Sequence, residues 1–336
     1  MKMNFLELGV GKGNQFWKYL LVIILAWTVG KFFGIIPYVI AVESRKRQVG
    51  DDSVYDFSNT FDFVAMGMSL NLGLLLLMFA FAFALFVFIG LVKVFHNGRT
   101  YKETINGTKK IRWNRVWVGV ITWGALMTIS TGIGLITNPE NYVFQFDIAK
   151  FIPLVLISLI FIPLQTTFEE LTFRGYFAQG LAGLTRSRWV VFLVPSISFG
   201  LLHMGNPEVI EHGFWIMMPG YILVGLVWGL ISILDDGIEL AIGAHAINNV
   251  FLSLFVTYSS AVFQTYAVFE IQEINPARSL IAISLYSIVF VYVLWRIYKW
   301  DFSILNKRVE KQEEEVIDAT ENEPNIGEAK YHAVNI

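Results

Sequence analysis

Long apolar runs that recur along the chain constrain its fold more than any other feature of the sequence. Of 336 residues, 55% are hydrophobic and only 15% are charged, and the mean hydropathy is +0.56. A helix needs about 20 mostly apolar residues to cross a bilayer. The sequence therefore predicts an all-α, polytopic membrane protein with about eight transmembrane helices. The predicted spans cover residues 16–41, 63–95, 116–137, 151–177, 189–205, 214–234, 238–258 and 279–300.

The fifth predicted span is interrupted by a proline. Pro195 removes a backbone donor from any helix that contains it, and "MGNPE" ends the apolar run soon afterwards. We expect the spanning helix to begin at Pro195, with "RSRWVVFLV" lying along the membrane interface.

Basic residues are distributed unevenly between the two sides that eight spans would create. One side receives the basic residues near both termini and those of the loops at 96–115 and 186–188. The other receives mainly Arg45, Lys46, Arg47, Lys150 and Arg278. Because Lys and Arg favour cytoplasmic loops, both termini are predicted to be cytoplasmic. No concentrated basic module indicates a nucleic-acid partner.

Three charged residues lie near the end of the fourth predicted span, within "FEELTFRG", residues 168–175. A charge in a membrane segment is expensive unless it is paired or functional. Glu170 and Arg174 are four residues apart in the favourable order, so we expect them to pair and to support the structure. Glu169 lies about 100° around the helix and lacks that partner. A carboxylate so placed is either protonated or used in chemistry.

Two histidines and an asparagine add polar groups to other predicted spans. His203 follows "SISFGLL" in the fifth, and His245 and Asn249 lie one helical turn apart in the seventh. Each alone is more typical of a residue that packs and hydrogen-bonds between helices. Together with Glu169 they could activate a water molecule, with the amide stabilising a developing oxyanion. Two histidines and a glutamate could equally bind zinc.

Three short motifs occur in order along the second half of the chain: "EELTFR", "FGLLH" and "HAINN". They match the patterns EExxxR, FxxxH and HxxxN. Their order and spacing resemble the CPBP family of intramembrane proteases, also called the Abi or CAAX-protease-and-bacteriocin-processing family, which includes the type II CaaX prenyl endopeptidases. The resemblance covers roughly residues 150–258. It implies that Glu170 and Arg174 support the first motif and that the site lies in an intramembrane catalytic cavity.

The resemblance also implies roles for the other matching residues. Glu169 would activate the hydrolytic water with the assistance of His203, while His245 and Asn249 would hold water and stabilise the oxyanion. The family is called metalloprotease by name, and a metal-free glutamate mechanism is also argued for it. The cofactor is thus open between zinc or another divalent metal, with His203 and His245 as candidate ligands, and none. The chain has no cysteine, which excludes thiolate ligands and thiolate nucleophiles.

The predicted spans, the composition of the C-terminal stretch and this resemblance together divide the chain into three parts. Residues 1–145 would hold the first three transmembrane helices and a basic cytoplasmic loop, and residues 146–300 a CPBP-like catalytic core. Residues 301–336 form a polar, acidic tail that is predicted to be disordered.

The function that follows is an intramembrane endopeptidase of a prokaryotic cell membrane. Its partners would be the lipid bilayer and a membrane protein or lipidated peptide as substrate. One alternative is a non-catalytic, CPBP-like scaffold or regulator, for example in bacteriocin immunity. The other is a small transporter with a proton-relay carboxylate.

Overall fold

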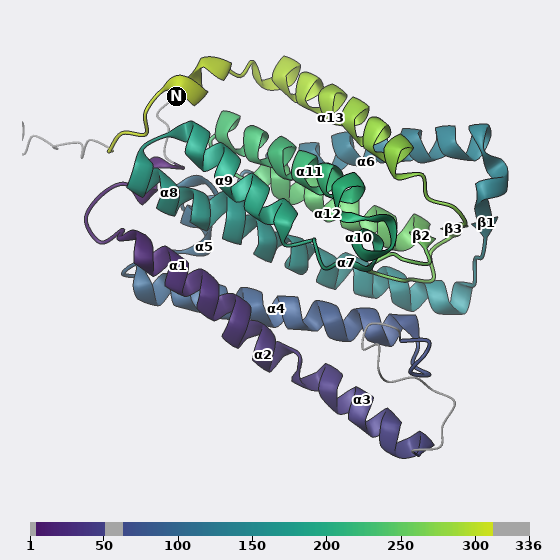
Figure 1. The fold of residues 1–336 in the computed structure, drawn as a ribbon. Helices are drawn as coiled ribbons and strands as arrows, with labels where there is room; N and C mark the ends of the chain where they lie inside the picture. The colour runs from purple at the N-terminus through teal and green to yellow at the C-terminus, as the bar shows by residue number, and fades with distance from the viewer. Residues whose placement is uncertain (1–4, 51–62, 312–336) are drawn as a thin grey trace, which may run out of the picture.

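Helices that run back and forth make up nearly all of the computed structural model, which describes residues 5–50 and 63–311 (Figure 1). The helices are α1 Phe16–Leu25, α2 Lys31–Gly34, α3 Ile36–Val49, α4 Leu70–Phe95, α5 Tyr101–Asn106, α6 Trp113–Thr137, α7 Ile148–Glu170, α8 Ala178–Thr185, α9 Arg188–Leu201, α10 Pro207–His212, α11 Phe214–Leu234, α12 Glu239–Phe255 and α13 Pro276–Tyr298. Short 3₁₀ helices cover Glu7–Gly9, Pro139–Asn141 and Phe302–Asn306, and π-helical turns cover Ala26–Gly30 and Leu171–Phe177.

Six helical stretches among the described residues are long and apolar enough to cross a membrane. They are Phe16–Val49, Leu70–Phe95, Trp113–Thr137, Ile148–Thr185, Phe214–Leu234 and Pro276–Tyr298. The prediction of an all-α polytopic membrane protein is thereby confirmed. The count of eight is not confirmed, because α9 and α12 are shorter apolar helices.

Three very short strands are the only strands in the described part of the chain. β1 (Tyr142–Phe144) pairs antiparallel with β3 (Phe269–Ile271), and β3 pairs parallel with β2 (Val256–Tyr258). Val256 pairs with Phe269 across the parallel pair. This small sheet lies at the end of the bundle opposite the two described chain ends (Figure 1).

Polar side chains mark where several of the long helices begin. Ser69 starts α4, Asp147 starts α7 and Asn275 starts α13, and each side chain accepts a hydrogen bond from a backbone N–H of the first turn. Such caps satisfy donors that have no partner inside the helix.

Pro195 does not start the fifth helix, contrary to the prediction. α9 begins at Arg188, with Ser187 as its N-cap, and Pro195 lies inside it. Around this proline α9 packs very closely on α11: a Cβ added to Gly225 would lie 2.5 Å from the carbonyl oxygen of Ser196. Packing against a neighbouring helix lets a membrane helix tolerate a proline.

The fourth predicted span is also longer than expected. α7 continues through the π turn at Leu171–Phe177 into α8 and ends at Thr185 rather than at residue 177. Glu169 therefore lies 16 residues before that end, which corresponds to about 24 Å at the helical rise rather than about 13 Å. The carboxylate is deeper in the bundle than the sequence indicated.

The first part of the predicted tail packs on the bundle. Residues 302–306 form a 3₁₀ helix, and Leu305 and Val309 are buried in a core cluster with residues of α1, α4 and α8. These apolar side chains explain why residues 301–311 pack on the bundle. The rest of the predicted tail, 312–336, lies outside the described residues.

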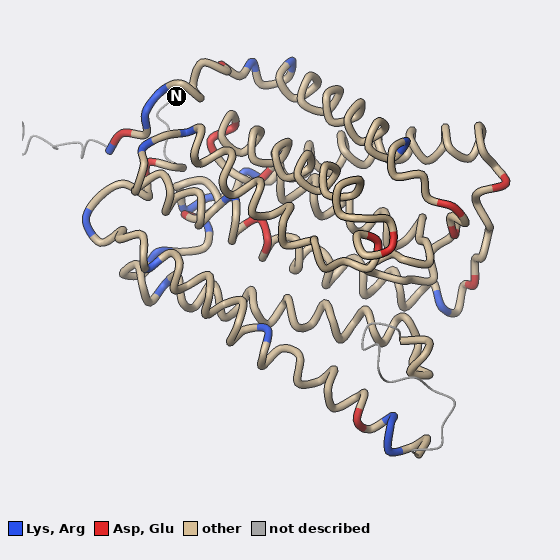
Figure 2. Tube along the Cα trace, viewed as in Figure 1, with Lys and Arg blue, Asp and Glu red and all other residues tan. Residues whose placement is uncertain are grey.

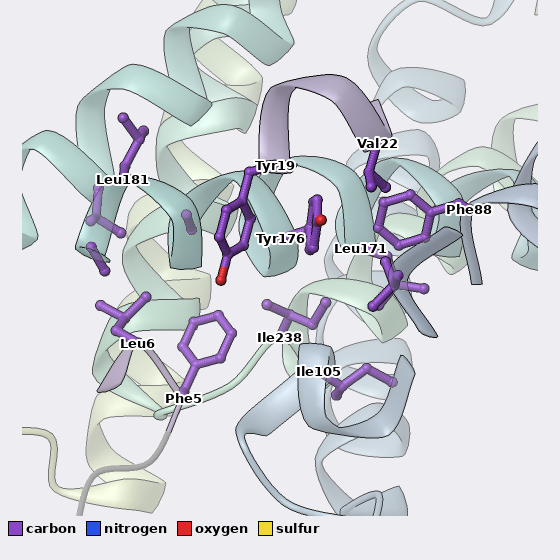
Figure 3. Packing of buried hydrophobic residues seen from close by; sticks show 14 of the residues in the cluster. Phe5, Leu6, Tyr19, Val22, Phe88, Ile105, Leu171, Tyr176, Leu181 and Ile238 are labelled. Atoms are coloured by element: carbon purple, nitrogen blue, oxygen red, sulfur yellow. The ribbon is translucent and has the colours of Figure 1, made fainter. Parts of the chain in front are cut away.

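That core cluster joins segments far apart in the sequence. Phe5 and Leu6 from the N-terminal end pack with Tyr19, Tyr176 and Leu181 (Figure 3). The N-terminal helices and the second half of the chain thus share one hydrophobic core, and the division at residue 145 remains a proposal.

Two glycines let α6 approach α12, which carries two of the predicted site residues. A Cβ added to Gly119 would lie 2.3 Å from the carbonyl oxygen of Leu240, and one added to Gly243 would lie 2.0 Å from that of Val116. Small residues at such crossings allow membrane helices to pack backbone against backbone.

We expect Gly119→Ala to destabilise the fold by about 1–3 kcal/mol, since the added methyl group forces α6 away from α12. Gly132→Ala in the same helix is the matched control, because nothing lies within 4 Å of the Cβ it would add. Thermal unfolding of both purified variants in detergent measures the difference. Equal unfolding temperatures would show that the α6–α12 contact is looser than described.

Candidate active site

The Glu170 carboxylate lies at the centre of the candidate site. It ends α7, its side chain is fully buried, and Oε1 accepts a hydrogen bond from Arg174 Nη1 at 3.0 Å. Arg174 stands in the π turn, where its Nη2 also donates to the carbonyl oxygen of Gly225 at 3.1 Å. The guanidinium lies 4.0 Å from the ring centre of Phe199. The predicted pairing within "EELTFR" is thus present.

His245 of α12 is held by the same carboxylate. Its Nδ1 lies 2.8 Å from Glu170 Oε1, and its ring stacks on Trp228 with centroids 4.2 Å apart. Because a carboxylate only accepts hydrogen bonds, Nδ1 carries the proton in this arrangement. Nε2 of a neutral ring is then left with its lone pair, and it lies 3.7 Å from Glu169 Oε2.

Glu169 presents a buried oxygen to that imidazole nitrogen. The residue is 7% exposed, and its Oε2 has no hydrogen-bond partner in the described part of the chain. Leaving a buried carboxylate oxygen without a donor is costly. A carboxylate oxygen and an imidazole lone pair that face each other can both accept from one water molecule. The prediction that Glu169 is not neutralised by Arg174 agrees with this geometry.

Asn249 completes this side of the site. Its Nδ2 donates to Gln165 Oε1 at 3.2 Å and lies 3.5 Å from His245 Nε2. Asn248 Nδ2 donates to Asn249 Oδ1 at 3.0 Å. The amide nitrogen therefore lies between Gln165 and the imidazole, and the residue is only half-buried.

His203 lies just beyond the end of α9. Its Nδ1 is 2.9 Å from the carbonyl oxygen of Phe199, and its ring stacks on Tyr221 at a centroid distance of 4.5 Å. The ring of Phe199 contacts both histidines, at 4.9 Å from His203 and 5.7 Å from His245. His203 interacts electrostatically with Glu169 and His245. The structure therefore brings His203 to the edge of the group, with no hydrogen bond to Glu169 among the described residues.

The donor set does not match a zinc site. Structural and catalytic zinc ions need at least three protein ligands. Glu169 Oε2 and His245 Nε2 lie 3.7 Å apart, whereas no hydrogen bond or ion pair joins His203 to either residue within the described part of the chain. Across the described ranges, no group of three or more His, Cys, Asp or Glu side chains could hold a metal ion. The metalloprotease alternative is therefore not supported.

Three site neighbours, Gln165, Trp228 and Tyr221, were not singled out from the sequence. Gln165 lies one turn before Glu169 on the same helix and is 3% exposed. Its polar side chain within an apolar run was the sequence signal that could have identified it. Trp228 and Tyr221 could not be distinguished in the sequence from other large side chains of a membrane span. Lys31 of α2 lies 4.0 Å from the ring centres of Trp27 and Phe81 and interacts electrostatically with Glu169.

Comparison with known proteins supports the motif assignment. Residues 148–251 match the family model described as type II CAAX prenyl endopeptidase Rce1-like. This segment contains all three motifs, so the family suggested by the sequence is confirmed for it. An uncharacterized protein of Bacillus subtilis (strain 168), YyaK, is 34% identical over 180 residues, which are 53% of this chain. The chain spans 60% of the length of that relative. No solved structure matches the present chain.

We expect Arg174→Ala to harm folding far more than Glu169→Gln. Removing the guanidinium leaves Glu170 buried without its cation and costs about 3–5 kcal/mol. Glu169→Gln keeps the shape and removes an oxygen that has no partner in the described structure. The yield of folded protein and the unfolding temperature in detergent separate the two. Arg174→Lys is the control that keeps the charge, and similar losses for all three would contradict this division of roles.

Proposed function

We propose that this CAAX-protease-like membrane protein hydrolyses a peptide bond in a membrane-associated or lipidated protein or peptide, using water activated by Glu169. The observation that carries the proposal is the approach of Glu169 Oε2 to His245 Nε2 at 3.7 Å, with the Asn249 amide beside them. A carboxylate, an oriented imidazole and an amide donor are the groups that peptide hydrolysis by a bound water requires.

The proposed reaction begins with a water between Glu169 and His245. Glu169 takes one proton as the water oxygen attacks the peptide carbonyl, and Asn249 Nδ2 donates to the oxyanion that forms. When the C–N bond breaks, the proton on Glu169 passes to the leaving nitrogen. The products are a carboxyl group and an amine.

The other polar groups would position these atoms. Glu170 fixes the orientation of the His245 ring through Nδ1, and Arg174 neutralises the charge of Glu170. His203 would assist the water from the more open edge, where both it and Asn249 are half-buried. We place the intramembrane cavity that admits the substrate on this edge.

The charge distribution supports the proposed orientation. Both described ends of the chain lie at one end of the bundle (Figure 1), and Lys and Arg gather there (Figure 2). Because basic residues favour the cytoplasmic face, we assign both termini to the cytoplasm. The bacterial relative supports a prokaryotic cell membrane.

The first experiment compares membrane proteomes of cells that carry wild type or Glu169→Gln, with new peptide termini read by mass spectrometry. Termini found only with wild type would name the substrate and assign the cleavage to Glu169. The matched control is Glu140→Gln, an exposed carboxylate outside the site, at equal protein level. If Glu169→Gln and wild type produce the same termini and the same phenotype, the non-catalytic scaffold replaces the protease.

With a substrate in hand, Asn249→Ala should lower kcat by about 10²–10³-fold, as expected when an oxyanion donor is lost. KM should change little, since the amide acts on charge that develops in the transition state. Steady-state kinetics of the purified variants measure both constants. Asn71→Ala, which removes an amide from α4, is the control. A rise in KM with kcat unchanged would instead assign Asn249 to ground-state binding.

A further inference from the structure

A small pocket lies at the end of the bundle that holds both described chain ends. Its volume is ≈ 260 Å³, and residues 185–189 and 305–308 line it. The two segments are joined by an antiparallel bridge between Ser187 and Arg308 and by the hydrogen bond from Val309 N to Arg186 O at 2.9 Å. The pocket is therefore built by backbone contacts rather than by loosely placed side chains.

Four basic residues line this pocket, and two of them have acidic partners. Lys307 pairs with Asp301 at 3.3 Å, and Arg188 pairs with Glu7 at 2.5 Å. The exposed side chain of Arg308 makes no hydrogen bond or ion pair with any described residue. Arg186 donates only to a backbone carbonyl, that of Val309, at 3.3 Å. The pocket thus carries an excess of positive charge.

Arg188 is the least satisfied of these side chains. It is 3% exposed, and its Nε and Nη1 lack hydrogen-bond partners among the described residues, although both are buried. Guanidinium donors in that state are costly, and because both atoms are buried they form part of the pocket wall rather than an accessible anion contact. Arg188 is also the first residue of α9, so the helix N-terminus adds to the preference for an anion.

Arg186 occupies a backbone conformation that favours glycine. Its φ is 58°, at the left-handed position that ends α8. Glycine is the usual residue there. Lys299 has the same left-handed conformation at the end of α13, so this backbone position places the Arg186 side chain at the pocket without requiring an arginine there.

We propose that this pocket binds a phosphate group, supplied by the headgroup of an anionic phospholipid. Large apolar side chains are exposed beside it: Leu184, Trp189 and Phe302 are 59%, 44% and 43% exposed. Trp189 Nε1 donates to Asn306 Oδ1 at 3.0 Å, which places an amphipathic ring next to the cations. Tryptophan beside basic residues is typical of the level of lipid headgroups. This site is separate from the residues proposed for peptide hydrolysis.

The test uses the purified full chain in a neutral detergent. Dioctanoyl phosphatidylglycerol, dioctanoyl phosphatidylcholine and inorganic phosphate are titrated separately, and the unfolding temperature and bound mass by native mass spectrometry are followed. Phosphatidylglycerol should stabilise the wild type and bind at least tenfold more tightly than phosphatidylcholine. A stabilising effect of inorganic phosphate at similar concentrations would assign the pocket to a free phosphate compound and overturn the lipid source.

Variants locate the binding. Arg308→Gln should weaken binding of phosphatidylglycerol at least fivefold without changing the unfolding temperature of the lipid-free protein, because its side chain is exposed. Lys110→Gln removes the same charge from an exposed position outside the pocket and should leave binding unchanged. Arg186→Gln is a second variant within the pocket. Equal affinities for the wild type and all three variants would overturn the proposal.

Discussion

The buried carboxylate of Glu170 is the interaction on which the rest of the site depends. A charge that is fully buried must be compensated by partners within the protein. Here one oxygen receives both Arg174 and the imidazole of His245, which ties α7, the π turn and α12 together. Because His245 is fixed through Nδ1, its other nitrogen has only one direction in which to point, toward Glu169. Glu170 thereby ensures that the adjacent Glu169 faces Nε2 of His245.

The two adjacent glutamates show how much the sequence could predict about the site. Helical spacing separated Glu170 and Arg174 from Glu169, and three motifs indicated which helices would meet. The sequence could not show that Glu170 also holds His245, because that contact depends on how α7 and α12 pack. It also gave no reason to notice Trp228 or Tyr221, since an aromatic residue in an apolar run looks the same whether it faces lipid or an imidazole.

The sequence predicted the fold class correctly, but it predicted the ends of the helices less well. Apolar runs identified the long helices, but they could not show that packing of α9 on α11 would carry a helix through Pro195. The π turn was missed because the change in backbone hydrogen bonding leaves no mark on hydrophobic periodicity. Such turns are frequent at functional sites, and this one carries Arg174. The packed segment 301–311 was missed because two buried apolar residues are a weak signal within a polar stretch.

The shortness of α9 and α12 has a consequence for the surrounding bilayer. α9 holds 14 residues and α12 holds 17, so they reach about 21 Å and 26 Å, less than a hydrocarbon core of about 30 Å. Beside helices this short the bilayer becomes thinner, or headgroups and water enter its edge, so that its hydrocarbon thickness matches the helix length. His245 and Asn249 lie on α12 and His203 lies just beyond the end of α9, so a thinner bilayer at these helices would shorten the path along which water reaches Glu169. The membrane itself would be deformed where the reaction needs water.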